Sequence, residues 1–145
     1  MGNQPRSGYC LYVDENLCAW RTKKQTAGVL STCEAELVAS TVAGRDTVGL
    51  RNLFSEVLPI FAPQSRIQVK VTLQGDNDAA NAIASGDAAL RKVRHLDQAD
   101  LYIRKITAEY GPILRVNTND NSGDSLTKAL GRQKLEPLLS IMGLV

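Results

Sequence analysis

The apolar and polar positions of the chain predict short strands at its amino end and in its middle. Residues 67–73 alternate strictly between apolar and polar side chains, as in a strand that buries one face. Residues 9–13 and 17–21 are richer in apolar and aromatic side chains, and the polar turn between them predicts a β-hairpin. Shorter strands are predicted at residues 27–30 and 113–116.

In most of the remaining chain, the spacing of apolar side chains predicts helices. After Ser31, apolar side chains recur at helical intervals as far as about Val57. Ser31 and Thr32, with acidic side chains close behind them, are typical of a helix start, and Gly111-Pro112 is typical of a helix end. Besides this long helix, we predict a short helix capped by residues 76–78 and ending at Ala84, and helices at 94–110, 124–130 and 132–142.

This order of strands and helices predicts one α/β domain. Residues 1–7 are polar and include a proline, so we expect a flexible arm there, followed by a single domain over residues 8–145. The length of 145 residues is enough for one hydrophobic core. A content of 43% hydrophobic and 22% charged residues is ordinary for a soluble globular protein.

Charge and cysteine content narrow the function classes. A net charge of +2 gives no strong overall field toward nucleic acid, so any basic patch must be local. Three cysteines without a CxxC spacing favour buried thiols in a reducing compartment over a metal or redox role. The sequence has no secretory signal and no apolar run of bilayer length, so we expect a cytosolic or nuclear protein without a membrane partner.

Three acidic residues stand at predicted element boundaries. Glu36 lies early in the long helix, Asp76 ends the alternating strand, and Asp124 begins a short helix. Each of them alone is explained as a cap or as a partner of the helix dipole. Together they predict one divalent-metal site assembled by folding, because Mg²⁺ prefers hard oxygen ligands. Both interpretations stay open for each residue.

Several sequence blocks, in order along the chain, carry a family resemblance. They are Ser7-Gly8-Tyr9, Trp20 to Gln25, Ser31 to Glu36, Leu50 to Leu53, Asp76-Asn77, Arg94-His95-Leu96-Asp97, and Asp124 with Leu126 to Leu130. Any one block is weak evidence, but the ordered set covers almost the whole chain and is specific. On these blocks the chain resembles the ribonuclease H domain at the carboxyl end of copia-type (Ty1/copia) LTR-retrotransposon polyproteins.

The resemblance implies a ribonuclease H-like α/β fold, with a mixed β-sheet of about four strands flanked by helices. It implies hydrolysis of the RNA strand of RNA–DNA hybrids by carboxylates that hold two Mg²⁺ ions, with Mn²⁺ as an alternative. Carried over by motif, the catalytic and metal-binding acids are Glu36, Asp76 and Asp124. The implied partners are the hybrid and the upstream reverse transcriptase domain of the same polyprotein. The implied location is a cytoplasmic virus-like particle or the nucleus.

One acid of the family pattern has no match in this sequence. In the family, a first aspartate lies on an opening strand well before the Ser-Gly-Tyr block, whereas here none of the six residues before Ser7 is acidic. Asp14 is no replacement, because it lies at the far turn of the predicted hairpin. We therefore expect an amino-terminally truncated domain with an open strand edge. Two functions stay open: an endonuclease with impaired activity, or a catalytically inactive module that binds nucleic acid or protein.

Basic and amide side chains are the candidate contacts to nucleic acid. Lysine and arginine side chains bind phosphates, and amides can reach the 2′-hydroxyl groups along a shallow minor groove. For the basic residues, a solvated charged surface is an equal alternative. The candidates are Lys23, Lys24, Gln25, Asn77 and Arg94.

Four further residues have structural predictions. We expect Trp20 to anchor the core rather than to stack on a base, and Glu34 and Asp78 to be solvated. His95, the only histidine, is expected to form a structural hydrogen bond near the start of its helix.

Overall fold

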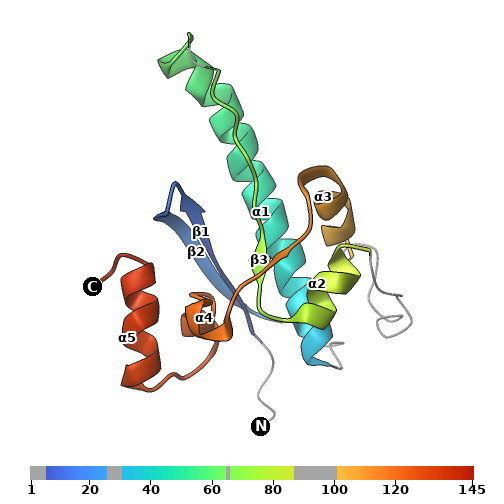
Figure 1. Ribbon diagram of the computed structural model, residues 1–145, viewed down its shortest axis with the longest axis vertical. Helices are drawn as coiled ribbons and strands as arrows, with labels where there is room; N and C mark the ends of the chain where they lie inside the picture. The colour runs from blue at the N-terminus through green and yellow to red at the C-terminus, as the bar shows by residue number, and fades with distance from the viewer. Residues whose placement is uncertain (1–5, 26–30, 65, 87–100) are drawn as a thin grey trace.

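The computed structural model describes residues 6–25, 31–64, 66–86 and 101–145. These residues form a mixed α/β arrangement of helices with small sheets (Figure 1). In chain order, the elements are β1 (Arg6–Val13), β2 (Asn16–Lys24), α1 (Thr32–Phe61), β3 (Gln74–Gly75), α2 (Asp78–Ala84), α3 (Ile103–Tyr110), β4 (Leu114–Arg115), a 3₁₀ helix (Thr118–Asp120), α4 (Asp124–Thr127) and α5 (Arg132–Ile141). Within these described ranges, no helix is both long and apolar enough to span a bilayer.

The strands form two separate pairs instead of the single mixed sheet that was expected. β1 and β2 are an antiparallel hairpin, and β3 pairs with β4 in parallel, with Gln74 opposite Leu114. Asp14 and Glu15 make the hairpin turn with positive φ angles of 46° and 66°. Arg6 and Ser7, the last residues of the predicted arm, belong to β1, while the strand predicted at 27–30 lies outside the described residues.

The strand predicted at residues 67–73 is wrong in its bounds. The paired segment is β3, at Gln74 and Gly75, just beyond the alternating residues. The Leu114 N–H donates to the Leu73 carbonyl at 2.8 Å, and the Val116 N–H donates to the Gly75 carbonyl at 3.1 Å. Among the described residues, none of residues 67–72 takes part in a backbone–backbone hydrogen bond. Alternation predicts which face a strand would bury, but a strand also needs a partner along its edge.

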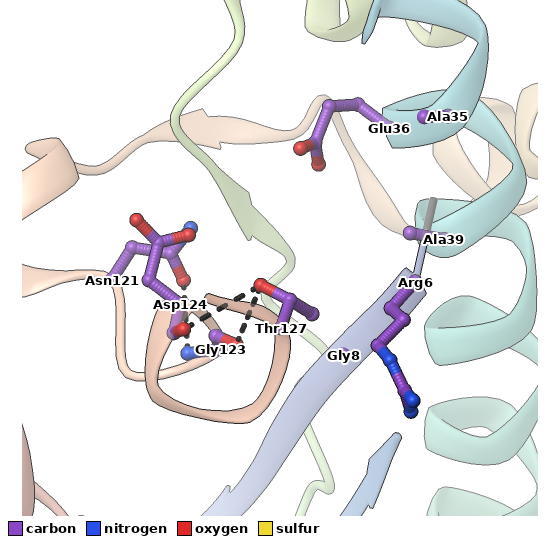
Figure 2. Close-up of a pocket in the computed structure, with 9 residues that line it drawn as sticks. All are labelled: Arg6, Gly8, Ala35, Glu36, Ala39, Asn121, Gly123, Asp124 and Thr127. Carbon is purple, nitrogen blue, oxygen red and sulfur yellow. Dashed lines mark hydrogen bonds between the residues drawn. The ribbon is translucent and has the colours of Figure 1, made fainter. Parts of the chain in front are cut away.

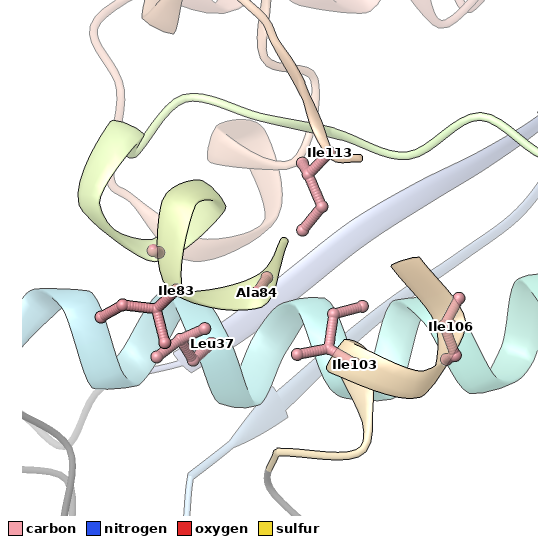
Figure 3. Packing of buried hydrophobic residues seen from close by; sticks show 7 residues of the cluster. Leu37, Ile83, Ala84, Ile103, Ile106 and Ile113 are labelled. Atoms are coloured by element: carbon pink, nitrogen blue, oxygen red, sulfur yellow. The ribbon is translucent and has the colours of Figure 1, made fainter. Parts of the chain in front are cut away.

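The hydrophobic core lies where α2 and α3 pack on the first half of α1 (Figure 3). Gly44 lets α3 approach closely, because a Cβ there would lie 2.8 Å from the Ile106 Cδ1 atom. The second half of α1 extends away from this core (Figure 1), and Phe61 near its tip is 82% exposed. The buried members of the cluster are Leu37, Ala80, Ile83, Ala84, Ile103, Ile106 and Ile113.

Helix α1 starts where the sequence predicts. The Ser31 hydroxyl accepts a hydrogen bond from the Glu34 N–H at 3.2 Å, and the helix runs past the predicted end at Val57 to Phe61. The prediction that Glu34 is solvated is wrong, because Glu34 is only 1% exposed. Glu34 lies three residues before Leu37 and seven before Thr41, which places all three on the buried face of the helix.

The β1–β2 hairpin is fastened to the rest of the molecule by polar contacts. The Tyr9 hydroxyl donates to the Asp46 carboxylate on α1, and the Tyr12 hydroxyl donates to the Ser122 hydroxyl at 2.9 Å. The Thr22 hydroxyl donates to the Leu126 carbonyl in α4 at 3.0 Å. The prediction that Trp20 anchors the core is wrong, since this side chain is 61% exposed on β2 and the core cluster draws no residue from the hairpin.

The remaining helices differ from their predicted bounds mainly at their ends. Asn77 caps α2 by accepting a hydrogen bond from the Ala80 N–H, and α2 ends at Ala84 as predicted. Helix α4 stops at Thr127, before the predicted end at residue 130, and α5 covers the predicted 132–142 almost entirely. Of the helix predicted at 94–110, residues 94–100 lie outside the described ranges, residues 101–102 form a turn, and α3 covers the remainder.

Candidate functional site

A small open cavity of about 30 Å³ lies between the first turns of α1, the start of β1 and the amino end of α4. Figure 2 shows the Glu36 and Asp124 carboxylates entering it from α1 and α4, while the Arg6 guanidinium is directed away from both. The lining residues are Arg6, Gly8, Ala35, Glu36, Ala39, Asn121, Gly123, Asp124 and Thr127.

Asp124 is held in place by close packing of α4 on β1. A Cβ at Gly8 would lie 2.5 Å from the Thr127 Cγ2 atom and 3.0 Å from the Gly123 carbonyl oxygen, so only glycine fits at this crossing. The hydrogen bond from the Thr22 hydroxyl to Leu126 fastens α4 to β2 as well. As a result, the Asp124 side chain is only 11% exposed at the cavity wall.

Asp76 follows β3 directly and is positioned by a short polar link to α2. The buried Asn81 side chain donates to the Gly75 carbonyl at 2.9 Å. A Cβ at Gly75 would lie 2.6 Å from the Asn81 Oδ1 atom, so glycine is needed for this approach too. Asn77, the next residue, uses its side-chain oxygen to cap α2.

The three predicted acids share one electrostatic environment. Burial raises the pKa of the Glu36 carboxyl above its ordinary value, and the charges of Asp76 and Asp124 raise it further. The ammonium group of Lys128 acts in the opposite direction. Asp76 and Asp124, from two other segments, therefore lie close enough to oppose the ionisation of Glu36, and these three acids are called the carboxylate cluster below.

Lys128 is a site residue that the sequence analysis missed. Its ammonium group donates to the Asp124 Oδ2 atom at 2.7 Å, and its backbone N–H donates to the Asp124 carbonyl at 3.0 Å. The available signal was the spacing, since an acid and a lysine four residues apart meet on one side of a helical turn. The site thus contains a cation supplied by the protein itself.

The donor chemistry of this cluster fits Mg²⁺ or Mn²⁺, whereas its spacing does not yet form a closed ligand set. Glu36, Asp76 and Asp124 supply hard carboxylate oxygens, which both ions accept as ligands. Among the residues that the structure describes, however, no three acidic, histidine or cysteine side chains stand close enough together to hold one ion.

The predicted nucleic-acid contacts have different surroundings. Lys23 and Lys24 are exposed at the end of β2. The amide of Gln25 is buried and donates to the Ser7 hydroxyl and the Ala35 carbonyl, both at 2.7 Å, so it joins the hairpin to α1 instead of facing solvent. Asn77 is half-buried as the α2 cap, and Arg94 lies outside the described residues together with His95.

Two other acids lie away from the cavity, as the sequence indicated. Asp14 is exposed in the hairpin turn, whereas the cavity is lined by Arg6 and Gly8 at the opposite end of β1. Asp78 is exposed on α2 and pairs with Arg115 at 2.7 Å. Neither carboxylate contributes to the lining of the cavity.

Comparison with known proteins shows a similarity that extends over most of the chain. The chain is 25% identical over 139 residues to the Retrovirus-related Pol polyprotein from transposon TNT 1-94 of Nicotiana tabacum, and the match covers 95% of the chain. The chain resembles a segment of a copia-type Pol polyprotein. It spans 10% of that relative's length. No protein-family model matches the chain, and no solved structure matches it.

Proposed function

We propose that this chain is a ribonuclease H-type endonuclease region of a copia-type Pol polyprotein, acting on the RNA strand of RNA–DNA hybrids. The observation that carries the proposal is that Glu36 and Asp124 line one cavity, while Asp76, from a third segment, lies near enough to raise the pKa of Glu36. The similarity to a Pol polyprotein over 95% of the chain supports the same assignment. The partners are then the hybrid and the upstream reverse transcriptase domain, in a cytoplasmic virus-like particle or in the nucleus.

The acids of the cluster would hold the divalent cations. When bound, Mg²⁺ or Mn²⁺ supplies activation of a water and stabilisation of the leaving oxygen. The chain's own residues bring the carboxylates together: α1 presents Glu36, the β3–α2 junction presents Asp76, and the α4–β1 contact presents Asp124. This sequence matches three of the four acids of the family pattern.

Lys23 and Lys24 are the proposed phosphate contacts among the described candidates. Both are exposed on β2, and β2 pairs with β1, which lines the cavity at Arg6 and Gly8. Lysine ammonium groups bind phosphates as point charges without reading sequence, which suits a hybrid recognised by its shape. Gln25 is not carried into this role, because its amide is hydrogen-bonded inside the protein.

The test is cleavage of a labelled RNA–DNA hybrid with Mg²⁺ and with Mn²⁺, comparing the wild type with Asp76→Asn. We expect cleavage that falls by more than about a hundredfold in the variant, since even outer-shell partners of a metal contribute about 10- to 100-fold. Asp78→Asn is the matched control, because Asp78 is two residues away but faces solvent and Arg115. Equal rates for wild type and Asp76→Asn would contradict the proposal.

Two observations favour a second function, a catalytically inactive ribonuclease H-like module that binds nucleic acid or protein. Lys128 already neutralises Asp124, and no three ligands stand together among the described residues. In the same assay, a folded wild-type sample that binds the hybrid without cleaving it would support this second function. Binding is measured by fluorescence anisotropy of the labelled hybrid.

A further inference from the structure

Lys128 contacts the carboxylate cluster at its most buried acid. Its ammonium group lies 2.7 Å from the Asp124 Oδ2 atom, and the Asp124 side chain is 11% exposed while that of Lys128 is 51% exposed. Among the described residues, this is the one ion pair formed by any of the three cluster acids. A lysine so placed has a fixed carboxylate partner but a stem that can swing into solvent.

The influence of Lys128 extends beyond Asp124. Burial lowers the pKa of its ammonium group, but the hydrogen bond and charge of Asp124, followed by the charges of Asp76 and Glu36, outweigh this and raise the pKa above its ordinary value. The same lysine lowers the pKa of Glu36, against the effects of burial and of the other acids. It is thus the cation that offsets the mutual repulsion of all three carboxylates.

We propose that Lys128 is a displaceable internal counter-ion of the cluster, which a divalent cation must move off Asp124 before it can bind there. The inference rests on the proposed function only in taking the cluster as a cation site. An ammonium group and a divalent cation repel each other and compete for the same carboxylate oxygens. Lys128 therefore sets the affinity of the site for Mg²⁺ and Mn²⁺, and keeps Asp124 paired when no cation is bound.

The test is a titration with Mn²⁺ that follows the electron paramagnetic resonance signal of the free ion. We expect Lys128→Met to bind Mn²⁺ about threefold more tightly than the wild type, as befits the loss of a partly exposed ion pair. Lys128→Arg keeps the charge and should retain the wild-type affinity. Lys134→Met, at an exposed lysine of α5, is the matched control and should change nothing.

A second measurement uses the wild type and does not depend on the folding of a charge-removing variant. In ¹⁵N spectra of the lysine Nζ groups, with the Lys128 signal assigned through Lys128→Arg, adding Mg²⁺ should move that signal to the position of a solvated lysine. The Lys134 signal should stay where it is. These shifts report displacement of the ammonium group without any nuclease activity.

The outcomes separate this proposal from the proposed function. Unchanged or weaker Mn²⁺ binding by Lys128→Met, with clear binding by the wild type, would overturn the role of Lys128 and leave the cation site standing. A Lys128 Nζ signal that does not shift at saturating Mg²⁺ would also overturn the role of Lys128 and leave the cation site standing. Absence of Mn²⁺ binding in the wild type and in every variant would overturn both the counter-ion role and the metal chemistry of the proposed function.

Discussion

The Glu36 carboxyl ionises in surroundings that oppose its charge. Burial raises its pKa, and so do the charges of Asp76 and Asp124, while Lys128 lowers it. An acid whose pKa is higher in the folded than in the unfolded protein does not lower the free energy of unfolding while it is protonated in both states. The folded state then loses stability as pH rises from the unfolded pKa, about 4.3 for glutamate, through the folded value.

Replacing Glu36 with glutamine should therefore stabilise the metal-free protein at neutral pH. We expect Glu36→Gln to raise the free energy of unfolding by about 0.5 kcal/mol at pH 7, a small value because the side chain is partly exposed and screened. The gain should vanish near pH 3, where the wild-type carboxyl is protonated in both states. Urea denaturation with a chelator present, at both pH values, measures it.

Glu56→Gln is the control for this prediction, because Glu56 is an exposed acid of the same helix. It should show no gain that depends on pH. If Glu36→Gln were instead less stable than the wild type at pH 7, the Glu36 carboxylate would be receiving more stabilisation from its surroundings than it loses by burial and repulsion.

At the scale of elements, the packing of α4 on β1 decides whether the cavity exists. Gly8→Ala should destabilise the protein by about 1–3 kcal/mol, the usual cost of overpacking. The new Cβ would meet the Thr127 Cγ2 atom at 2.5 Å and the backbone oxygen of Gly123 at 3.0 Å. Urea denaturation measures the loss.

A double variant locates that effect at the contact itself. Thr127→Ser removes the Cγ2 atom, so Gly8→Ala combined with Thr127→Ser should recover part of the lost stability. Gly49→Ala provides the opposite control, because a Cβ there meets nothing within 4 Å and alanine favours a helix by up to ~1 kcal/mol. Equal losses in Gly8→Ala with and without Thr127→Ser would contradict the steric explanation.

Local signals were enough to predict the starts of α1 and α2 and the hairpin. Ser31 and Asn77 cap α1 and α2, because a cap needs only the residues of its own turn. The strand at 67–73 and the burial of Trp20 were wrong, because both depend on which distant segment lies alongside. Pairing of strands into sheets is likewise a tertiary property, and alternation along one strand does not encode it.

The sequence was enough to propose the acids of the candidate site, but not the lysine that pairs with one of them. Glu36, Asp76 and Asp124 are recognisable by motif and boundary, and the structure brings them into one electrostatic cluster. That Lys128 pairs with Asp124, and that Gln25 is buried, depend on side-chain directions that spacing only suggests.

At the scale of the whole molecule, hydrogen bonding is uneven along the chain. We expect fast hydrogen exchange at the amides of residues 67–72, with protection factors below about 10, because these residues have no backbone partner among the described residues. The amides of Leu114 and Val116 donate hydrogen bonds to Leu73 and Gly75, so their protection factors should exceed about 100. Exchange read by NMR at single amides separates the two groups.

The amides of α1 provide an internal comparison in the same experiment. Those near Leu37 and Gly44 lie on the core and should exchange slowest, while those near the exposed tip at Phe61 should exchange fastest within the helix. Strong protection across residues 67–72 would mean that this segment has a partner strand in solution, and the predicted strand would then be correct after all.

The contacts that hold α4 join residues far apart in the sequence, and this separation affects when α4 can dock. The link from Tyr12 to Ser122 spans 110 positions, and the link from Thr22 to Leu126 spans 104. Closing such large loops is entropically costly and slow. On the ribosome, Glu36 and Asp76 emerge with most of the core before Asp124 is synthesised. The carboxylate cluster is therefore incomplete until α4 has been synthesised and has docked on the hairpin.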